Sequence, residues 1–325
     1  RRVRGARVLI NTGTAPAVPP IEGLADVPHW TSEDLLALPE LPDSLVVLGG
    51  GVIGVEMASL MGLLGVPVTV VHAGAHILDR EDDDVAAEVT AGLEALGVTI
   101  LTGARASRVA ATDGRGVVVT TADGREATGS HLLLALGRTP VTAGLGLEAA
   151  GVELTGRGFV RVDDHLRTTA PGVYAAGDVA GTPQFTHASW NDFRVLRDLF
   201  AGKEASTTGR LIPWAVFTTP ELGHVGLSEA EARKAGYEVR VAKTPTAAVP
   251  RAKTLGRTEG FFKVIIDART DLILGAAIIG AEASEVVASI QMAMLGGLRW
   301  QQVRDAVITH PTMSEGLNIV LDSLG

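Results

Sequence analysis

The chain has 325 residues, with 28 Lys or Arg against 37 Asp or Glu, a formal net charge of −9, and no cysteine. The acidic balance argues against a nucleic-acid-binding surface, which needs clustered basic side chains. The lack of thiols excludes disulfides, cysteine zinc sites, iron–sulfur clusters and a thiol nucleophile within these residues.

The length allows about two domains, and the 39 glycines predict many tight turns between strands and helices. The first predicted element is a strand over residues 7–11, which ends at Thr12 and Gly13. Six prolines follow between Pro16 and Pro42, a density typical of a connector. Residues 1–44 are therefore not expected to form a domain by themselves.

Residues 45–71 carry a single charged side chain, Glu56, over a length that could cross a membrane as a helix. Six glycines and a proline within the stretch argue against that interpretation. The sequence divides better into an apolar strand over 45–48, a glycine turn, a helix over 55–64 and a second strand over 68–71. No membrane segment is therefore predicted.

The glycine turn has the spacing Gly49-x-Gly51-x-x-Gly54. Glycines at these positions allow a tight turn, close approach of a pyrophosphate to the backbone, and close packing of helix on strand. The phosphates would then lie at the helix N-terminus. The alternative is a purely structural turn, but a strand before it and a helix and strand after it favour dinucleotide binding.

Position 72, directly after the second strand, is where an NAD-binding unit places an acidic residue for the ribose hydroxyls. This chain has His72 there, with Arg80 further on. One interpretation is tolerance of, or preference for, a 2′-phosphate. The other is drift at this position, with the ribose held elsewhere. The sequence leaves both open.

The remaining predicted elements follow a β-α-β-α-β order with an antiparallel insertion, and then change to an α+β module. In chain order they are a helix over 82–96, a strand over 98–101, a hairpin of 117–120 and 126–128, a strand over 131–135, a strand over 172–178, a helix over 192–201, strands over 261–266 and 272–279, and helices over 282–295 and 300–307.

Two further positions carry candidate chemistry. Asp178 ends a strand, where α/β sheets place ligands, and could accept a hydrogen bond from a polyol. His310 near Glu315 could be a general acid–base whose imidazole is oriented by the carboxylate. Turn capping by the aspartate and a Ser/Thr–Glu helix cap beside an ordinary histidine are the alternatives, and spacing alone favours them. No metal-ligand motif is found.

Five motifs occur in order along the chain: residues 9–16, residues 49–56, residues 136–140, residues 174–178, and His310-Pro311-Thr312 with Glu315. Together they resemble the pyridine nucleotide–disulfide oxidoreductase family, the flavoproteins that include dihydrolipoamide dehydrogenase, glutathione reductase and mercuric reductase. Residues 184–187, 191–194 and 250–252 look most like the mercuric-reductase-like branch that holds the reactive-chlorine-resistance and hypothiocyanous acid reductases.

The resemblance implies an α/β fold: a Rossmann-like NAD(P)-binding domain and a partial FAD-binding domain, followed by an α+β dimerisation domain. The implied boundaries are 1–44 for a flavin-domain remnant and connector, 45–138 for NAD(P) binding, 139–211 for the C-terminal part of the flavin domain, and 212–325 for dimerisation. The implied site residues are Gly13, Gly137 and Asp178 for FAD, Gly49, Gly51, Gly54 and His72 for NAD(P)H, Glu56 near the flavin, and His310 with Glu315 as the catalytic pair.

The implied activity is hydride transfer from NAD(P)H to FAD beside Glu56, and then electron transfer to a Cys pair that lies upstream of Arg1. His310 would handle the proton at the dithiol of the other subunit in a cytoplasmic homodimer, and the acceptor would be a small molecule or a thiol/disulfide. We expect a truncated chain that lacks about 100 or more N-terminal residues and is inactive alone. A cysteine-independent NAD(P)H dehydrogenase that reduces a quinone is one alternative, although such an enzyme needs no thiol base at His310. A non-catalytic dinucleotide-binding and dimerisation module is the other.

Overall fold

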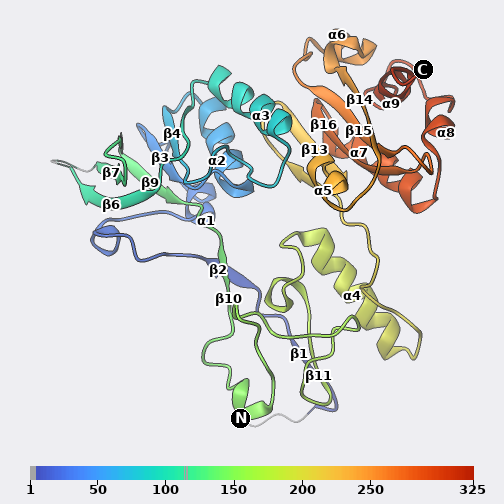
Figure 1. The fold of residues 1–325 in the computed structure, drawn as a ribbon. Coiled ribbons are helices and arrows are strands. Elements are labelled where there is room, and N and C mark those ends of the chain that lie inside the picture. Colours follow the sequence, from blue (N-terminus) through green and yellow to red (C-terminus); the bar gives the residue numbers. More distant parts are fainter. Residues whose placement is uncertain (1–4, 113, 115) are drawn as a thin grey trace. The chain divides into compact units, whose positions relative to one another are not determined.

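The computed structural model describes residues 5–112, residue 114 and residues 116–325. The chain divides into two compact units. The smaller unit combines Arg1–Ala17 with Gly137–Ile212, and the larger combines Val18–Leu136 with Pro213–Gly325. The predicted mixed α/β architecture is confirmed (Figure 1).

The smaller unit brings the first predicted strand next to one far along the chain. Strand β1 (Val8–Ile10) pairs in parallel with β11 (Val173–Ala175), and β2 (Thr14–Pro16) pairs antiparallel with β10 (Arg138–Pro140). A 3₁₀ turn, η3 (Gly177–Ala180), follows β11 directly and leads toward helix α4 (Thr186–Phe200).

Helix α4 begins at Thr186, six residues before the predicted start at Asp192. In the structure Asp192 lies within the helix and is fully buried. It shares the apolar face with Ala188, Val195 and Leu196, so the boundary prediction was wrong because this carboxylate serves tertiary contacts.

The larger unit begins with a parallel sheet in the order β5-β4-β3-β9. All four residues of β3 (Leu45–Leu48) are buried, as expected for a central parallel strand. Its neighbours are β4 (Val68–Val71) and β9 (His131–Leu134), and β5 (Thr99–Leu101) forms the edge. The connecting helices are α2 (Val52–Leu63) and α3 (Asp83–Ala95).

The predicted antiparallel insertion is a three-stranded sheet. The hairpin of β7 (Val117–Thr121) and β8 (Glu126–Gly129) was expected, and β6 (Ala106–Ala111) adds a strand that was not. The short elements that accompany these parts of the chain are η1 (Leu24–Asp26), α1 (Ser32–Leu36) and η2 (Glu148–Ala150).

The C-terminal part of the larger unit is a five-stranded antiparallel sheet in the order β12-β13-β16-β15-β14. Its strands are β12 (Trp214–Val216), β13 (Glu221–Gly226), β14 (Val239–Pro245), β15 (Phe261–Asp267) and β16 (Ile273–Gly280). Its helical elements are α5 (Glu229–Lys234), η4 (Thr246–Ala248), α6 (Pro250–Leu255), α7 (Ala283–Leu295), α8 (Trp300–Arg304) and α9 (Gly316–Asp322). Only β15, β16, α7 and α8 were predicted.

One apolar core runs through both sheets of the larger unit. It includes Val47 and Val89 from the parallel part together with Leu222, Phe261 and Ile279 from the five-stranded sheet. The two parts are therefore packed as one body, and their division into domains near residues 138 and 212 stays a prediction.

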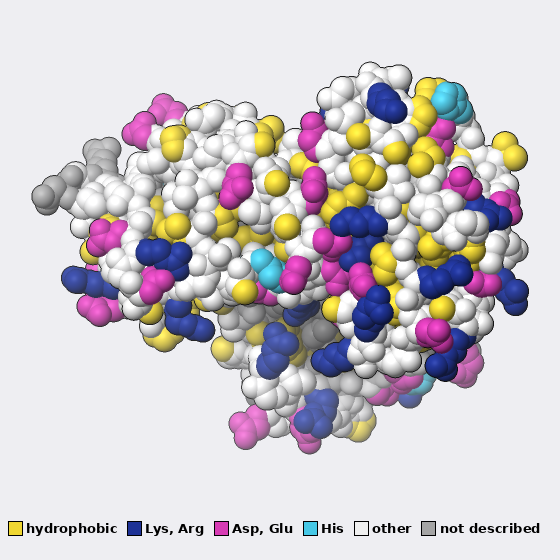
Figure 2. Space-filling view, turned by 45° about the horizontal axis from the view of Figure 1, so that its top comes forward, with side chains coloured by type: hydrophobic (Ala, Val, Ile, Leu, Met, Phe, Trp, Pro, Cys, Tyr) yellow, Lys and Arg dark blue, Asp and Glu magenta, His cyan; other side chains and the backbone are white. Residues whose placement is uncertain are grey.

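Two predictions concern surfaces. Among the described residues, no helix is both long and apolar enough to cross a membrane. On the face shown in Figure 2, basic and acidic side chains are interspersed, and no broad basic patch forms there.

Candidate functional site

The glycine turn after β3 is shaped by backbone contacts that leave no room for side chains. Gly49 has φ of 109°, and a Cβ on it would overlap the carbonyl oxygen of Ala135. A Cβ on Gly54 would overlap the carbonyl oxygen of Gly49. Both glycines are therefore needed for the turn and for the packing of α2 on the sheet.

Gly51 differs from its neighbours because nothing within 4 Å would meet a Cβ built on it. It is the N-cap of α2, and no side chain caps the helix there. The open space beside these uncapped amides fits the pyrophosphate of a dinucleotide, which the helix dipole would favour. The chain thus offers the cradle that the Gly49-x-Gly51-x-x-Gly54 spacing predicts.

His72 is buried against this turn, with 9% of its surface exposed. The Gly50 N–H donates to its Nδ1 at 3.1 Å, and its Nε2 lies 3.1 Å from Asp79 Oδ1. Since a backbone N–H only donates, Nδ1 is the acceptor and Nε2 carries the proton toward Asp79. His72 therefore braces the glycine turn.

Asp79 was missed by sequence reasoning. It lies seven residues beyond His72 in sequence. Its hydrogen bond with His72 nevertheless places the carboxylate beside the end of β4. Its side chain is 58% exposed. A carboxylate thus lies near the position where NAD-binding units place one, although position 72 itself has none.

Glu56 lies on α2, and its Oε1 accepts a hydrogen bond from the Phe217 N–H at 2.9 Å. Burial raises the pKa of the Glu56 carboxyl, and the Phe217 hydrogen bond offsets only part of that effect. The Thr219 N–H donates to Ser59 Oγ on the same helix. The segment after β12 therefore holds α2 at two points.

The smaller unit places the second cofactor motif at the end of β11. The Thr14 hydroxyl donates to Asp178 Oδ2 at 2.8 Å and accepts from Arg138 Nε at 2.6 Å. Gly13 and Gly137, each with positive φ, leave open space where a Cβ would stand. The half-buried carboxylate and these open glycines fit a polyol-bearing flavin.

Asp192 organises this motif and was not predicted as a site residue. Its Oδ2 accepts the Gly177 N–H and the Thr182 hydroxyl, each at 2.7 Å. Arg210 Nη1 lies 2.6 Å from Oδ1. Four polar groups are thus joined inside the unit, and Gly177 is fixed directly before Asp178.

His310 and Glu315 are paired as expected: His310 Nδ1 lies 2.7 Å from Glu315 Oε2. The imidazole side chain is 67% exposed, whereas the glutamate side chain is 13% exposed. Glu315 also accepts from the Thr312 N–H, and the Glu315 N–H donates to the Thr312 hydroxyl, both at 3.3 Å. The capping interpretation and the dyad interpretation therefore both describe this segment.

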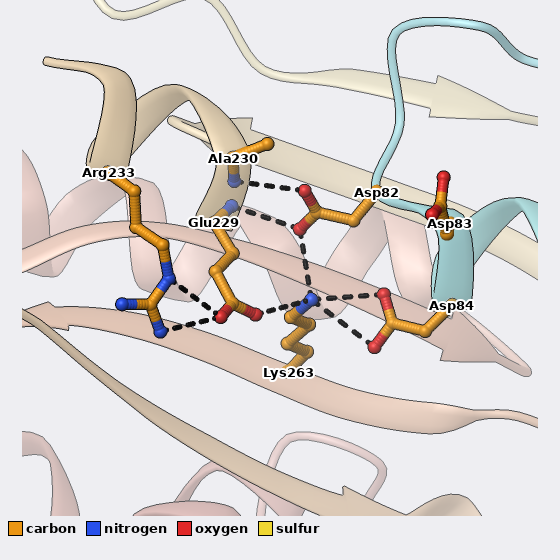
Figure 3. A pocket seen from close by; sticks show the side chains of 7 residues that line it. All are labelled: Asp82, Asp83, Asp84, Glu229, Ala230, Arg233 and Lys263. Atoms are coloured by element: carbon orange, nitrogen blue, oxygen red, sulfur yellow. Dashed lines mark hydrogen bonds and ion pairs between the residues drawn. The ribbon is translucent and has the colours of Figure 1, made fainter.

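A separate charged pocket lies between α3, α5 and β15 (Figure 3). Lys263 Nζ, with its side chain only 3% exposed, contacts Asp82 at 2.9 Å, Asp84 at 3.0 Å and Glu229 at 3.1 Å. Burial alone would raise the pKa of each of these carboxyls, but hydrogen bonds, those from Lys263 among them, leave all three below their usual values. The ammonium occupies the centre, so we assign this cluster to folding and not to a metal.

No group of side chains suited to holding a metal ion occurs in the described part of the chain. The candidate chemistry therefore consists of the two glycine-bounded cradles, the half-buried Glu56 and the exposed His310 ring.

Comparison with known proteins shows which family the chain belongs to. A model described as pyridine nucleotide-disulphide oxidoreductase matches residues 1–192, and the dimerisation-domain model of the same family matches residues 212–320. The chain belongs to the pyridine nucleotide-disulphide oxidoreductase family. The resemblance carried by the sequence motifs is thereby confirmed.

Individual relatives agree with the family models. A probable pyridine nucleotide-disulfide oxidoreductase, RclA of Escherichia coli, is 39% identical over 97% of this chain and 72% of its own length. A dihydrolipoyl dehydrogenase of Thermus scotoductus is 40% identical over 97% of the chain and 69% of its length. A mercuric reductase of Bacillus cereus is 34% identical over 98% of the chain and 51% of its length.

The fold agrees as well. The solved structure of the HOCl-induced flavoprotein disulfide reductase RclA from E. coli superimposes with a TM-score of 0.94 at 39% identity, covering 99% of this chain and 74% of that one. The predicted function as an FAD-containing, NAD(P)H-dependent oxidoreductase is confirmed at the level of the family. The roles of individual residues stay predictions.

Proposed function

We propose that the chain supplies the NAD(P)H cradle, part of the flavin site and the acid–base pair of a homodimeric reductase whose final acceptor is a thiol/disulfide or a small molecule. When bound, nicotinamide and flavin supply the hydride transfer. The thiols of the proposal come from outside these 325 residues, which contain no cysteine. A cytoplasmic location is part of the same proposal.

The single observation that carries the acceptor assignment is the His310–Glu315 pair. With Nδ1 on the buried carboxylate, the ring is held in one orientation while most of it stays accessible. Such an imidazole is suited to taking and returning a proton through Nε2.

In the nicotinamide site, the amides at the start of α2 would bind the pyrophosphate, and Gly51 would leave it room. Glu56, held by Phe217, would stand beside the flavin, as the family resemblance implies. In the flavin site, Asp178 would accept a hydrogen bond from a ribityl hydroxyl, with Thr14 holding its other oxygen.

The homodimer is supported by the match to the dimerisation-domain model. We further propose that each His310 serves the flavin site of the other subunit, as a two-fold interface allows. Light scattering at micromolar concentration is expected to report a dimer, and a monomer would contradict this part of the proposal.

The acceptor assignment is tested in the enzyme that carries the thiols. His310→Ala is expected to slow disulfide-dependent turnover by roughly 10²–10⁴-fold, the range for loss of a general acid–base. The same variant should reduce ferricyanide or a quinone with NAD(P)H at the unaltered rate, since those acceptors need no proton at a thiol. Equal loss with both acceptors, or loss with neither, would refute the acid–base role.

A further inference from the structure

The segment between β4 and α3 holds both backbone polar groups of one residue of the glycine turn, Gly50. Gly50 donates its N–H to His72, and its carbonyl oxygen accepts the Leu78 N–H at 2.8 Å. A Cβ on Gly50 would press into the Ile77 and His72 side chains. Residues 72–78 therefore fix the orientation of a peptide directly before Gly51.

This bracing segment does not hold its conformation by local preference. Leu78 has φ of 53°, in the left-handed region that residues other than glycine seldom adopt. Its side chain is 5% exposed, and the adjoining Ile77 is fully buried. A strained backbone of this kind persists only where the surroundings hold it.

The far end of the segment is held by Glu81. Its Oε2 lies 2.7 Å from His224 Nδ1, and its Oε1 accepts the Trp214 Nε1–H at 3.0 Å. The Glu81 side chain is 5% exposed and the His224 side chain 1%. The Glu81 N–H also donates to the Leu78 carbonyl oxygen at 2.8 Å. The buried carboxylate and the residue with the strained backbone therefore belong to the same turn.

Both donors to Glu81 belong to the five-stranded sheet and lie directly opposite each other. Trp214 on β12 pairs with His224 on β13, and their rings stack 4.0 Å apart. The same cross-strand row continues through Ala277 on β16 to Lys263 on β15, which binds Asp82 and Asp84. One row of the sheet thus contacts Glu81 and Asp82, just before α3, and Asp84 in its first turn.

We propose that Glu81 is a positioning residue of the dinucleotide site: through Trp214 and His224, the dimerisation-domain sheet sets the conformation of residues 72–81 and thereby of the Gly50 peptide. The inference rests on the proposed dinucleotide site at Gly49–Gly54. With Glu81 released, the segment must be ordered when the dinucleotide binds, and that ordering weakens binding. NADH and NADPH should be affected alike, because they share the pyrophosphate.

The test uses two tryptophans of the same sheet region. Trp214→Phe removes one indole N–H donor to Glu81, and Trp300→Phe removes an equivalent donor to Asp271 at 2.9 Å, within the dimerisation region. Titration calorimetry with NADH and NADPH should show roughly three- to tenfold weaker binding for Trp214→Phe, the effect of one lost hydrogen bond. Trp300→Phe should bind as the unaltered chain does.

Hydrogen exchange gives a second readout. The amides of Gly50 and Leu78 should exchange faster in Trp214→Phe than in Trp300→Phe, because His72, which accepts from Gly50, and Leu78 itself both belong to the released segment. Glu81→Gln, which keeps the shape and one acceptor oxygen, should show the same pattern. Glu88→Gln is its control: Glu88 also reaches the dimerisation region, at the Gly260 N–H, but has no contact with the segment.

Gly51→Val separates this inference from the site on which it rests. If Gly51→Val leaves binding intact, the proposed dinucleotide site is wrong. If Gly51→Val abolishes binding while Trp214→Phe and Glu81→Gln bind normally, or if Trp300→Phe weakens binding equally, the positioning role of Glu81 is refuted.

Discussion

The two cofactor motifs of this chain lie at the ends of two parallel strands and are built in different ways. At the end of β3 the turn is fixed by backbone atoms, which exclude a Cβ at Gly49 and Gly54. At the end of β11 the motif is fixed by side chains, because Asp192 holds Gly177 and Thr14 holds Asp178. The glycine requirement of the first turn is visible in its local spacing, although His72 also braces Gly50 there. The second motif depends on side chains that only the fold brings together.

The largest expected effect lies at the side-chain-built end. Asp192→Ala removes a fully buried carboxylate, leaves Thr182 and the Gly177 N–H without this acceptor, and takes from Arg210 its carboxylate partner. We expect a loss of about 3–5 kcal/mol of folding free energy, as for a broken buried ion pair. Urea denaturation measures it. Asp198→Ala on the same helix, which removes a solvent-screened pair with Arg197, should cost far less than Asp192→Ala.

If Asp192→Ala and Asp198→Ala proved equally mild, the end of β11 would not depend on its side-chain contacts. The contrast with β3 would then fail.

The glycine turn at the end of β3 is tested by adding a side chain at Gly51, where only the bound dinucleotide should contact it. Gly51→Val places a branched side chain in the open space at the start of α2. We expect NAD(P)H binding to weaken by on the order of 100-fold, about 2.7 kcal/mol, with the fold retained. Titration calorimetry and a thermal melt measure the two effects.

Gly156→Val is the matched control for Gly51→Val. Gly156 also has open space around its Cβ position, and no positive φ is recorded for it, but it belongs to the smaller unit. The Gly156→Val variant should bind NAD(P)H as the unaltered chain does. Weakened binding in both variants would mean that the loss reports a general disturbance.

Sequence reasoning identified the strand, turn and helix at the first strand end. At the second it identified the strand and Asp178 but missed Asp192. The spacing of Gly49, Gly51 and Gly54 is a local pattern, so the strand, turn and helix around it were predicted. Asp192 was taken for a helix start because its partners at Gly177 and Arg210 are 15 and 18 residues away and form no local pattern. Glu81 was missed for the same reason, since Trp214 and His224 are 133 and 143 residues distant.

The strands of the five-stranded sheet show the same limit of prediction from local sequence patterns. Strands β15 and β16 were predicted because both are rich in large or β-branched apolar residues. Strand β13 reads Glu-Leu-Gly-His-Val-Gly, and β14 ends in Lys-Thr-Pro, so neither has the composition of a strand. Their pairing with stronger neighbours determines their structure.

A smaller effect is expected at the end of β4, where Asp79 could influence the choice between NADH and NADPH. Asp79→Asn removes the carboxylate beside His72 while keeping an acceptor oxygen for its Nε2–H. The loss of negative charge near the ribose position should favour the 2′-phosphate, so the NADPH-to-NADH affinity ratio should rise several-fold, about 1 kcal/mol. An unchanged ratio from paired titrations would place the 2′ position away from Asp79.

The smallest expected effect concerns Glu56, the carboxylate on the helix that the glycine turn begins. Burial raises its pKa above the usual 4.5, so the folded chain binds this proton more tightly than the unfolded chain. Its contribution to stability is therefore largest below pH 4.5, falls as the pH rises through the raised folded pKa, and stays low at neutral pH.

Glu56→Gln removes that dependence, because the amide is neutral and its oxygen still accepts the Phe217 N–H. The variant should match the unaltered chain near pH 4 and exceed it at pH 7, by less than about 1 kcal/mol. Urea denaturation at both pH values measures the difference, with the exposed Glu94→Gln as a control that should show none. If Glu56→Gln were instead less stable at pH 7, the carboxylate would be favoured in its charged form. The end of β3 would then depend on a side-chain charge as well as on its glycines, and the contrast with β11 would narrow.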